Sequence, residues 1–177
     1  MTPTATLLAL IVRVAVSGVV LAEGRLTHHL DKLQCGEVTA RLRTTCVEQI
    51  QAGWECVEQS LQLINRAGIT KDITLDSRLV PSWAVPGRTA LDGYVAEWTC
   101  VQSQSGRHYL DLLYTCGESG NGCASANPGG EWEQLVDETG RVVAGGRNGS
   151  APGSLERLGL WKLLHGTTHV TGVGPNK

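Results

Sequence analysis

Apolar residues recur at three- and four-residue intervals in two stretches of the first third of the chain, residues 26–50 and 54–64. Such spacing places apolar side chains along one face of a helix. Gly68 follows the second stretch and can adopt the left-handed conformation that ends a helix. The pattern therefore predicts a helical hairpin, with helices over residues 27–51 and 54–66.

The middle of the chain alternates apolar and polar positions instead. Residues 93–102 and 107–116 each follow a period of two, which predicts two antiparallel strands of one hairpin. Their apolar faces coincide if Cys100 lies opposite Leu110. This register needs a loop with an odd number of residues, and a three-residue loop closed by a left-handed Gly106 is the common solution.

A second hairpin is predicted around the turn at residues 137–140, with strands over residues 131–136 and 141–144. Ser154 can cap a short helix, and the glycine- and threonine-rich tail at residues 166–177 is predicted to be flexible. These elements predict an α+β fold, in which the N-terminal helical hairpin packs on an antiparallel sheet of two hairpins.

The first 22 residues predict a signal peptide. Arg13 is followed by nine apolar or small residues that end at Ala22, where cleavage is expected. A membrane anchor would need about 20 uninterrupted apolar residues, and Arg13 lies in the centre of this stretch. We therefore expect one exported domain over residues 23–177, with no stable membrane insertion after cleavage.

All six cysteines follow this leader. An even number of cysteines behind a secretory signal predicts a disulfide framework in an oxidising compartment, so the sequence predicts a periplasmic or secreted protein. The cysteines are Cys35, Cys46, Cys56, Cys100, Cys116 and Cys123.

The predicted elements restrict how these cysteines pair. Three of them precede residue 66 and three follow residue 93, so at least one bridge must join the two parts. Cys100 and Cys116 share a strand face but lie roughly 20 Å apart along it, which is too far for a disulfide. A bond between Cys35 and Cys56 is compatible with the helical hairpin. The pairs that we favour are Cys46–Cys56, Cys116–Cys123 and Cys35–Cys100.

Composition and motifs exclude several functions. The formal net charge of −2 is too small to predict binding to nucleic acid or to an anionic membrane. The chain has no CxxC pair, nucleotide-binding glycine loop or serine elbow, and the spacing of its histidines does not match a metal site. We therefore expect no metal and no cofactor, and a non-enzyme more readily than an enzyme.

A small secreted hydrolase is the alternative interpretation. It would use His108 or strand carboxylates, and it requires a cleft that gathers at least two titratable groups with shifted pKa values. The carboxylates on the predicted strands are Glu97, Asp111, Glu131 and Glu133.

The loop between Pro81 and Pro86 carries the remaining candidate. Trp83 lies in this loop outside any alternating pattern, and Arg88 follows it. Exposed tryptophan and arginine residues are typical anchors of protein interfaces, although Trp83 could instead fold under the loop as a plug. The sequence thus predicts an exported, disulfide-stabilised protein that binds another exported macromolecule, such as an envelope inhibitor, immunity protein or accessory factor.

Overall fold

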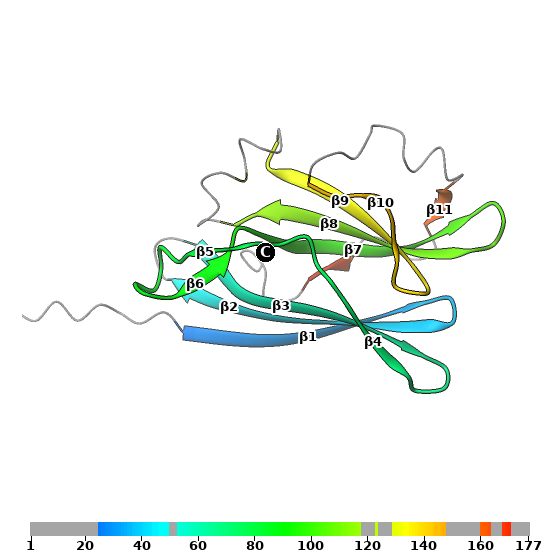
Figure 1. The fold of residues 1–177 in the computed structure, drawn as a ribbon, viewed down its shortest axis with the longest axis horizontal. Helices are drawn as coiled ribbons and strands as arrows, with labels where there is room; N and C mark the ends of the chain where they lie inside the picture. Colours follow the sequence, from blue (N-terminus) through cyan, green and yellow to red (C-terminus); the bar gives the residue numbers. More distant parts are fainter. Residues whose placement is uncertain are drawn as a thin grey trace, which may run out of the picture.

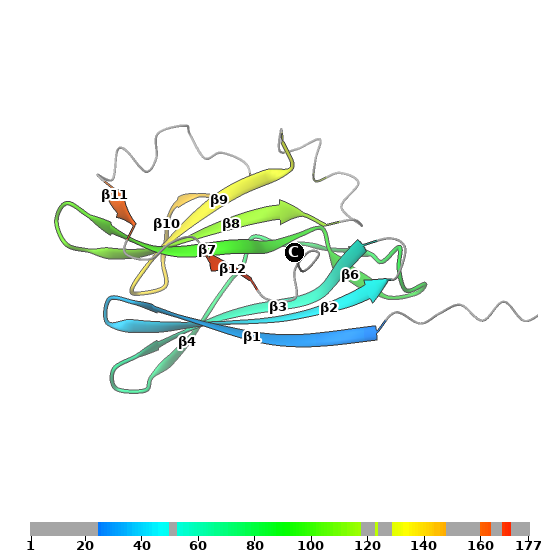
Figure 2. The ribbon, with the colours of Figure 1, turned by 180° about the vertical axis from the view of Figure 1, so that it is seen from behind.

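The computed structural model describes residues 25–49, 53–117, 123, 129–147, 160–163 and 168–170. These residues form antiparallel strands in three sheets, with no helical element among them. Two larger sheets lie over one another as two layers (Figure 1), and the same layers are seen from behind in Figure 2. The predicted signal peptide and its cleavage site lie outside the described residues.

The first sheet is built from the N-terminal third of the chain. Its strands follow one another in the order β1-β2-β3-β4. The strands are β1 (Arg25–Cys35), β2 (Val38–Gln49), β3 (Gly53–Asn65) and β4 (Thr70–Ile73).

The predicted helical hairpin is therefore wrong, and so is the α+β class. Residues four apart share a face of a strand as well as a face of a helix, because four is a multiple of the strand period of two. In β2 the residue midway between two apolar residues distinguishes a strand from a helix. Ala40 is as buried as Val38 and Leu42, which is the period of a strand. The arginines at the alternate positions of β2 are exposed.

Two glycines form hairpin turns in place of the predicted helices. Gly36 lies within the first predicted helix, and Gly68 follows the second. Gly36, with a φ of +58°, lies in the two-residue turn that joins the paired residues Cys35 and Val38. Gly68, with a φ of +78°, closes the turn between β3 and β4 and donates its amide to the carbonyl of Asn65. Both positions need a left-handed backbone, which glycine adopts at little cost.

The second sheet has the order β10-β9-β8-β7-β11, and β12 also pairs with β7. Its strands are β7 (Gly93–Ser103), β8 (His108–Cys116), β9 (Glu131–Asp137), β10 (Val142–Gly145), β11 (Leu160–Leu163) and β12 (Thr168–His169).

Both predicted hairpins of this sheet are present. In the first, Cys100 lies opposite Leu110, and Gly106 has a φ of +82°. The amide of Ser103 donates to the carbonyl of Arg107 over 2.9 Å, which leaves the three-residue loop that the sequence predicted.

A β-bulge changes this register at the other end of the hairpin. Pairing shifts between Val95 and Glu97, so Tyr94 lies opposite Thr115, whereas an unbroken Cys100–Leu110 register would place it opposite Cys116. The extra residue moves Val95 onto the core face.

The C-terminal part of this sheet also differs from the prediction. Residues 160–163, within the helix predicted from Ser154, form strand β11; residues 154–159 and 164 lie outside the described part. Two residues of the predicted flexible tail form β12 and pair with β7.

The third sheet is the small hairpin of β5 (Leu79–Pro81) and β6 (Thr89–Leu91), which closes the proline-bounded loop.

The main core lies between the two large sheets. Leu42 and Leu61 of the first sheet share one buried cluster with Trp98, Leu112 and Tyr114 of the second. Burial of these apolar faces against each other is the main source of stability that the fold offers.

Three disulfides are present, and their pairs are those that the sequence favoured. One joins the two large sheets over 65 residues of sequence, one joins β2 to β3, and one closes the segment after β8. In that order they are Cys35–Cys100, Cys46–Cys56 and Cys116–Cys123. The bridge that joins β2 to β3 forms because the two cysteines lie opposite each other on neighbouring strands, a relation that a folded hairpin produces whether its arms are helices or strands.

Candidate functional site

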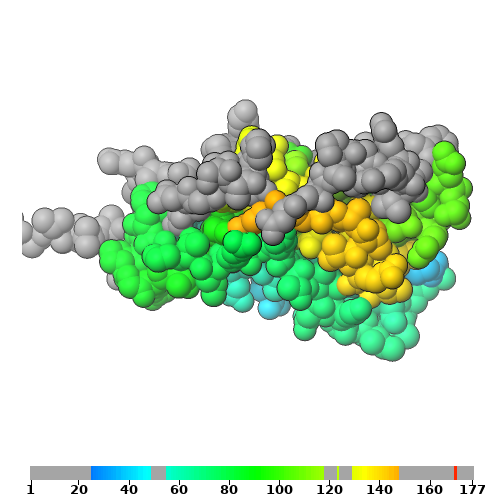
Figure 3. All heavy atoms as spheres, turned by 45° about the horizontal axis from the view of Figure 1, so that its top comes forward, coloured from blue at the N-terminus to red at the C-terminus, as the bar shows by residue number. Residues whose placement is uncertain are grey.

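The loop over residues 82–88, between β5 and β6, carries both residues that the sequence predicted for binding. Trp83 is 42% exposed, so it is not buried under the loop as a plug. Arg88 is also exposed and directly precedes β6. Figure 3 shows the β5–β6 hairpin, in green, at one end of the molecule.

A buried carboxylate holds this loop. Glu55 of β3 is only 1% exposed. Its carboxylate accepts hydrogen bonds from the Ser82 hydroxyl at 2.5 Å, the Trp83 amide at 3.1 Å and the Ala84 amide at 3.2 Å. Hydrogen bonds to a charged acceptor are stronger than neutral ones, so this contact fixes the backbone that presents Trp83.

The loop also has hydrogen bonds of its own. The Val85 amide donates to the Ser82 hydroxyl at 2.8 Å, and the Arg88 amide donates to the Val85 carbonyl at 3.1 Å. The Ser82 amide donates to the Arg88 carbonyl at 2.8 Å. A loop that is ordered before binding loses less conformational entropy when a partner arrives.

The base of the β5–β6 hairpin is tied to the core by a buried ion pair. The side chains of Arg147 and Asp92 are 3% and 8% exposed, and both terminal nitrogens of Arg147 contact the Asp92 carboxylate. The Arg78 amide donates to the same carboxylate at 2.9 Å. Burial raises the pKa of Asp92, but the hydrogen bonds from Arg147 and Arg78 outweigh it, and the pKa lies below its usual value.

Aromatic rings continue this contact into the core. The guanidinium of Arg147 lies over the ring of Trp132 at 4.5 Å, and Trp132 stacks on Tyr114 at 5.0 Å. Gly93 lies against the Trp132 ring, so closely that a side chain at this position would overlap it. The hairpin that carries Trp83 is thus anchored at its base and at its loop.

The residues of the alternative hydrolase interpretation are only partly brought together. Asp111 lies near Glu133, and burial, with a smaller contribution from the Glu133 charge, raises the pKa of Asp111 to about 6. His108 is three residues before Asp111 on the same strand, so the two side chains lie on opposite faces of the sheet. His108 pairs with Glu138 instead, at 3.3 Å from Nδ1 to Oε1.

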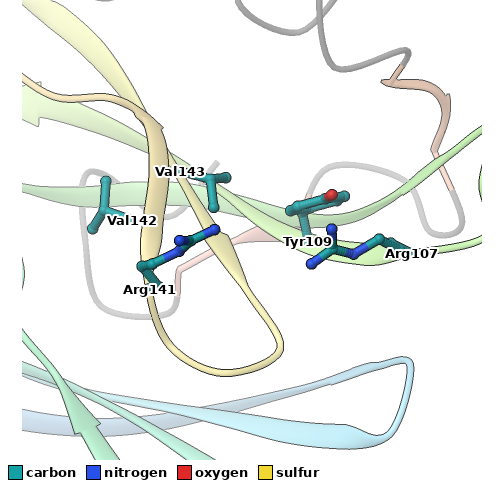
Figure 4. A pocket seen from close by; sticks show the side chains of 5 residues that line it. All are labelled: Arg107, Tyr109, Arg141, Val142 and Val143. Atoms are coloured by element: carbon teal, nitrogen blue, oxygen red, sulfur yellow. The ribbon is translucent and has the colours of Figure 1, made fainter.

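A cavity of about 370 Å³ lies on the outer face of the second sheet. It is not lined by any of these carboxylates. Figure 4 shows its five lining residues, which are Arg107, Tyr109, Arg141, Val142 and Val143.

Within the described ranges, no group of three or more histidine, cysteine or acidic side chains could hold a metal ion. His28 contacts the Thr45 hydroxyl at 3.0 Å. Of the described residues, none forms a helix long and apolar enough to cross a membrane.

The fold and the disulfides define a disulfide-stabilised β-sandwich with one anchored, tryptophan-bearing loop. Three disulfides fit a protein of an oxidising compartment. No protein-family model, curated protein or solved structure matches the chain.

Sequence reasoning found Trp83 and Arg88 but missed Glu55, Asp92 and Arg147. Nothing in the sequence distinguishes a buried acidic residue on a strand from a solvated one, because its burial depends on a loop that arrives 27 residues later. The cavity had a usable signal, since Arg107 and Arg141 each directly follow the glycine of a predicted hairpin turn.

Proposed function

We propose that the chain is an exported, non-catalytic protein that binds a macromolecular partner through the loop at residues 82–88. The observation that carries this proposal is the contrast within the loop, where an exposed Trp83 is presented by a backbone that the buried Glu55 carboxylate holds in place. An ordered backbone beneath an exposed aromatic side chain is the arrangement that a binding anchor requires.

The chemistry of the surface limits the partner. Trp83 and Leu79 are exposed and apolar, and Arg88 adds a positive charge on the same hairpin. A matching protein partner would offer an apolar pocket for the indole with a carboxylate beside it. Tryptophan and arginine together account for a large share of binding energy in such interfaces.

The test uses the exported protein with its disulfides intact. Tagged wild type, Trp83→Ala and Arg88→Ala are compared in pull-downs from secreted or periplasmic extract of the source organism. Ile69→Ala is the matched control, because Ile69 is an exposed apolar residue on a different turn. We expect a partner that wild type and the control retain and that Trp83→Ala loses, with affinity reduced by about thirtyfold, the effect of a hot-spot residue.

Recovery of the same partner by all four proteins would contradict the proposed surface. Failure to recover any partner with wild type would contradict the proposed function itself. Mass spectrometry of the exported protein under non-reducing conditions tests the export step separately, since we expect an N-terminus at Glu23 and no free thiol. A retained leader with free cysteines would show that the protein is not exported.

A further inference from the structure

The cavity on the outer face of the second sheet is formed where two hairpin turns meet. β8 and β9 are antiparallel neighbours, and Tyr109 pairs with Asp137 at this end of the sheet. The turn before β8 and the turn after β9 therefore lie side by side. Arg107 comes from the first turn and Arg141 from the second, and Figure 4 shows Arg107 beside the Tyr109 ring and Arg141 reaching toward them from the other hairpin.

Both arginines are held at the backbone in the same way. Each directly follows a left-handed glycine, and each carbonyl accepts the amide of the residue that opens its turn, from Ser103 to Arg107 at 2.9 Å and from Asp137 to Arg141 at 3.0 Å. Their Cα positions are thus set by the hairpins, while the side chains remain exposed to solvent. Such preorganisation reduces the entropy lost on binding.

The charge of the cavity is positive. In the part of the chain that the structure describes, no carboxylate contacts the guanidinium of Arg107, which lies 5.9 Å from the centre of the Tyr109 ring. Arg141 contacts Asp137 through Nε at 3.5 Å, and its side chain is 72% exposed, so its guanidinium is accessible to a ligand. The other acidic residue of this turn, Glu138, is directed toward His108 and the Glu37 amide.

The carboxylate beside Arg141 belongs to Asp137, and it already accepts hydrogen bonds within its own turn. One oxygen of the Asp137 carboxylate accepts hydrogen bonds from the Thr139 amide at 2.9 Å, the Thr139 hydroxyl at 2.6 Å and the Arg141 amide at 3.0 Å. This carboxylate closes the turn and does not neutralise both arginines. The two guanidinium groups therefore leave a net positive charge beside Tyr109 and Val143, which pack together in one apolar cluster.

We propose that this cavity binds a small organic oxyanion, in which a phosphate, sulfate or carboxylate group is attached to an aromatic or aliphatic body. Guanidinium groups bind such oxyanions through paired, charge-assisted hydrogen bonds. The Tyr109 ring and Val143 would contact the apolar body. A volume of about 370 Å³ is in the range of small-molecule pockets, and this one is open to solvent on the side of its exposed arginines. This site is separate from the loop at residues 82–88 and does not depend on its function.

The experiment is a titration of the full, disulfide-bonded protein at low ionic strength, followed by amide chemical shifts and calorimetry. The probes are phenyl phosphate, benzoate, inorganic phosphate and phenol. We expect saturable shifts at Tyr109 and Val143 with phenyl phosphate or benzoate. Phenyl phosphate should bind about tenfold more tightly than inorganic phosphate if the apolar body contributes, and phenol should not saturate.

Variants assign the binding to the two guanidinium groups. Arg107→Ala and Arg141→Ala should each weaken binding by about tenfold or more, and the lysine variants should lie between alanine and wild type, since lysine keeps the charge but loses the paired geometry. Arg43→Ala is the control, because Arg43 is an exposed arginine on the first sheet, and it should bind as wild type does. Thermal midpoints of all variants establish that they fold.

The probes that saturate the site identify the class of oxyanion that it binds. Saturation by phenyl phosphate alone would assign the site to phosphate or sulfate esters, and saturation by benzoate alone would assign it to carboxylates. No saturable shift with either probe would overturn the proposal. Equal affinity in wild type and both alanine variants, or binding of phenol as tight as that of phenyl phosphate, would also overturn it.

Discussion

The two large sheets bury their faces differently. The first sheet packs one face against the core, while its other face carries exposed residues such as Leu30, which is 52% exposed. The second sheet buries residues on both faces: Leu112 lies in the core between the sheets, and Tyr109 and Leu135 form a second cluster on the outer side. The cavity lies on this second cluster, so the sheet with two buried faces is also the one that carries a candidate ligand site.

Charged groups follow the same division. On the first sheet, Arg66 pairs with Glu37 at the surface, where their side chains are 79% and 58% exposed. Beside the second sheet, Arg147 pairs with Asp92 at 3% and 8% exposure. Water solvates the first pair in both the folded and the unfolded chain, but only the protein can solvate the second pair once the chain has folded. The two pairs should therefore contribute very differently to stability.

Removal of the arginine from each ion pair should produce the largest difference in stability between the two sheets. Arg147→Ala leaves the Asp92 carboxylate buried without its partner, and we expect a loss of about 3 to 5 kcal/mol in the free energy of unfolding. Arg66→Ala should cost about 1 kcal/mol or less. Urea denaturation of both variants measures the difference. Equal losses would show that the buried ion pair contributes no more to the free energy of unfolding than the exposed one.

Removal of the disulfides tests how strongly the sheets depend on each other. Cys35–Cys100 joins the two sheets over 65 residues, and Cys46–Cys56 joins neighbouring strands over 10. Chain entropy predicts a loss of about 4 kcal/mol for the first double alanine variant and about 3 kcal/mol for the second. Thermal unfolding of both variants checks the order, which would be reversed if the sheets held together mainly by their apolar faces.

Truncation of one leucine on each outer face compares the faces directly. Leu135→Ala, at a residue that is 2% exposed, should cost about 3 kcal/mol because it leaves a cavity in the outer cluster. Leu30→Ala should change stability by about 0.5 kcal/mol or less. Similar urea midpoints for the two variants would mean that the outer cluster of the second sheet adds little to the fold.

The smallest effect is the pH dependence contributed by Asp111. Its pKa is raised from 3.8 to about 6 in the folded chain, so between these values the folded state binds more protons than the unfolded state. Stability should therefore fall as pH rises from about 4 to 6, by about 2 kcal/mol after allowance for partial exposure. Asp111→Asn should remove this decline.

Unfolding measured at several pH values compares the two proteins. Asp92 and Asp137 have lowered pKa values, and their contributions are lost only as pH falls below their usual range near 4. These losses occur in wild type and in Asp111→Asn alike, so the difference between the two proteins isolates Asp111. If the stability of Asp111→Asn changed with pH in parallel with that of wild type, the decline could not be assigned to Asp111.

The predictability of the fold also divides between the two sheets. Residues 94–100 and 110–116 have an apolar residue at every second position, and the odd loop that this alternation requires correctly placed Gly106 and the Cys100–Leu110 register. Residues 38–46 have apolar residues mainly at spacings of four, which a helix and a strand satisfy equally. The buried Ala40 and Thr44 at the intervening positions favour a strand, but small or polar residues give a weak signal.

Local patterns also reveal only part of the candidate sites. Trp83 could be found because an aromatic residue in a proline-bounded loop does not fit either period. The pairing of β8 with β9 joins two separately predicted hairpins, and only this pairing brings Arg107 and Arg141 to one cavity. Glu55 and Arg147 acquire their roles from loops distant in sequence.

The sequence by itself determined the short-range features of this protein: the two hairpins of the second sheet, their turn glycines and the two local disulfides, Cys46–Cys56 and Cys116–Cys123. Each of these depends on periodicity, turn chemistry or the distance between neighbouring residues. Only the tertiary structure decided that the first third forms strands, that charges are buried beside Trp132, and that two arginines share a cavity. Pairing partners and burial are properties of the whole packed chain, and local patterns do not specify them.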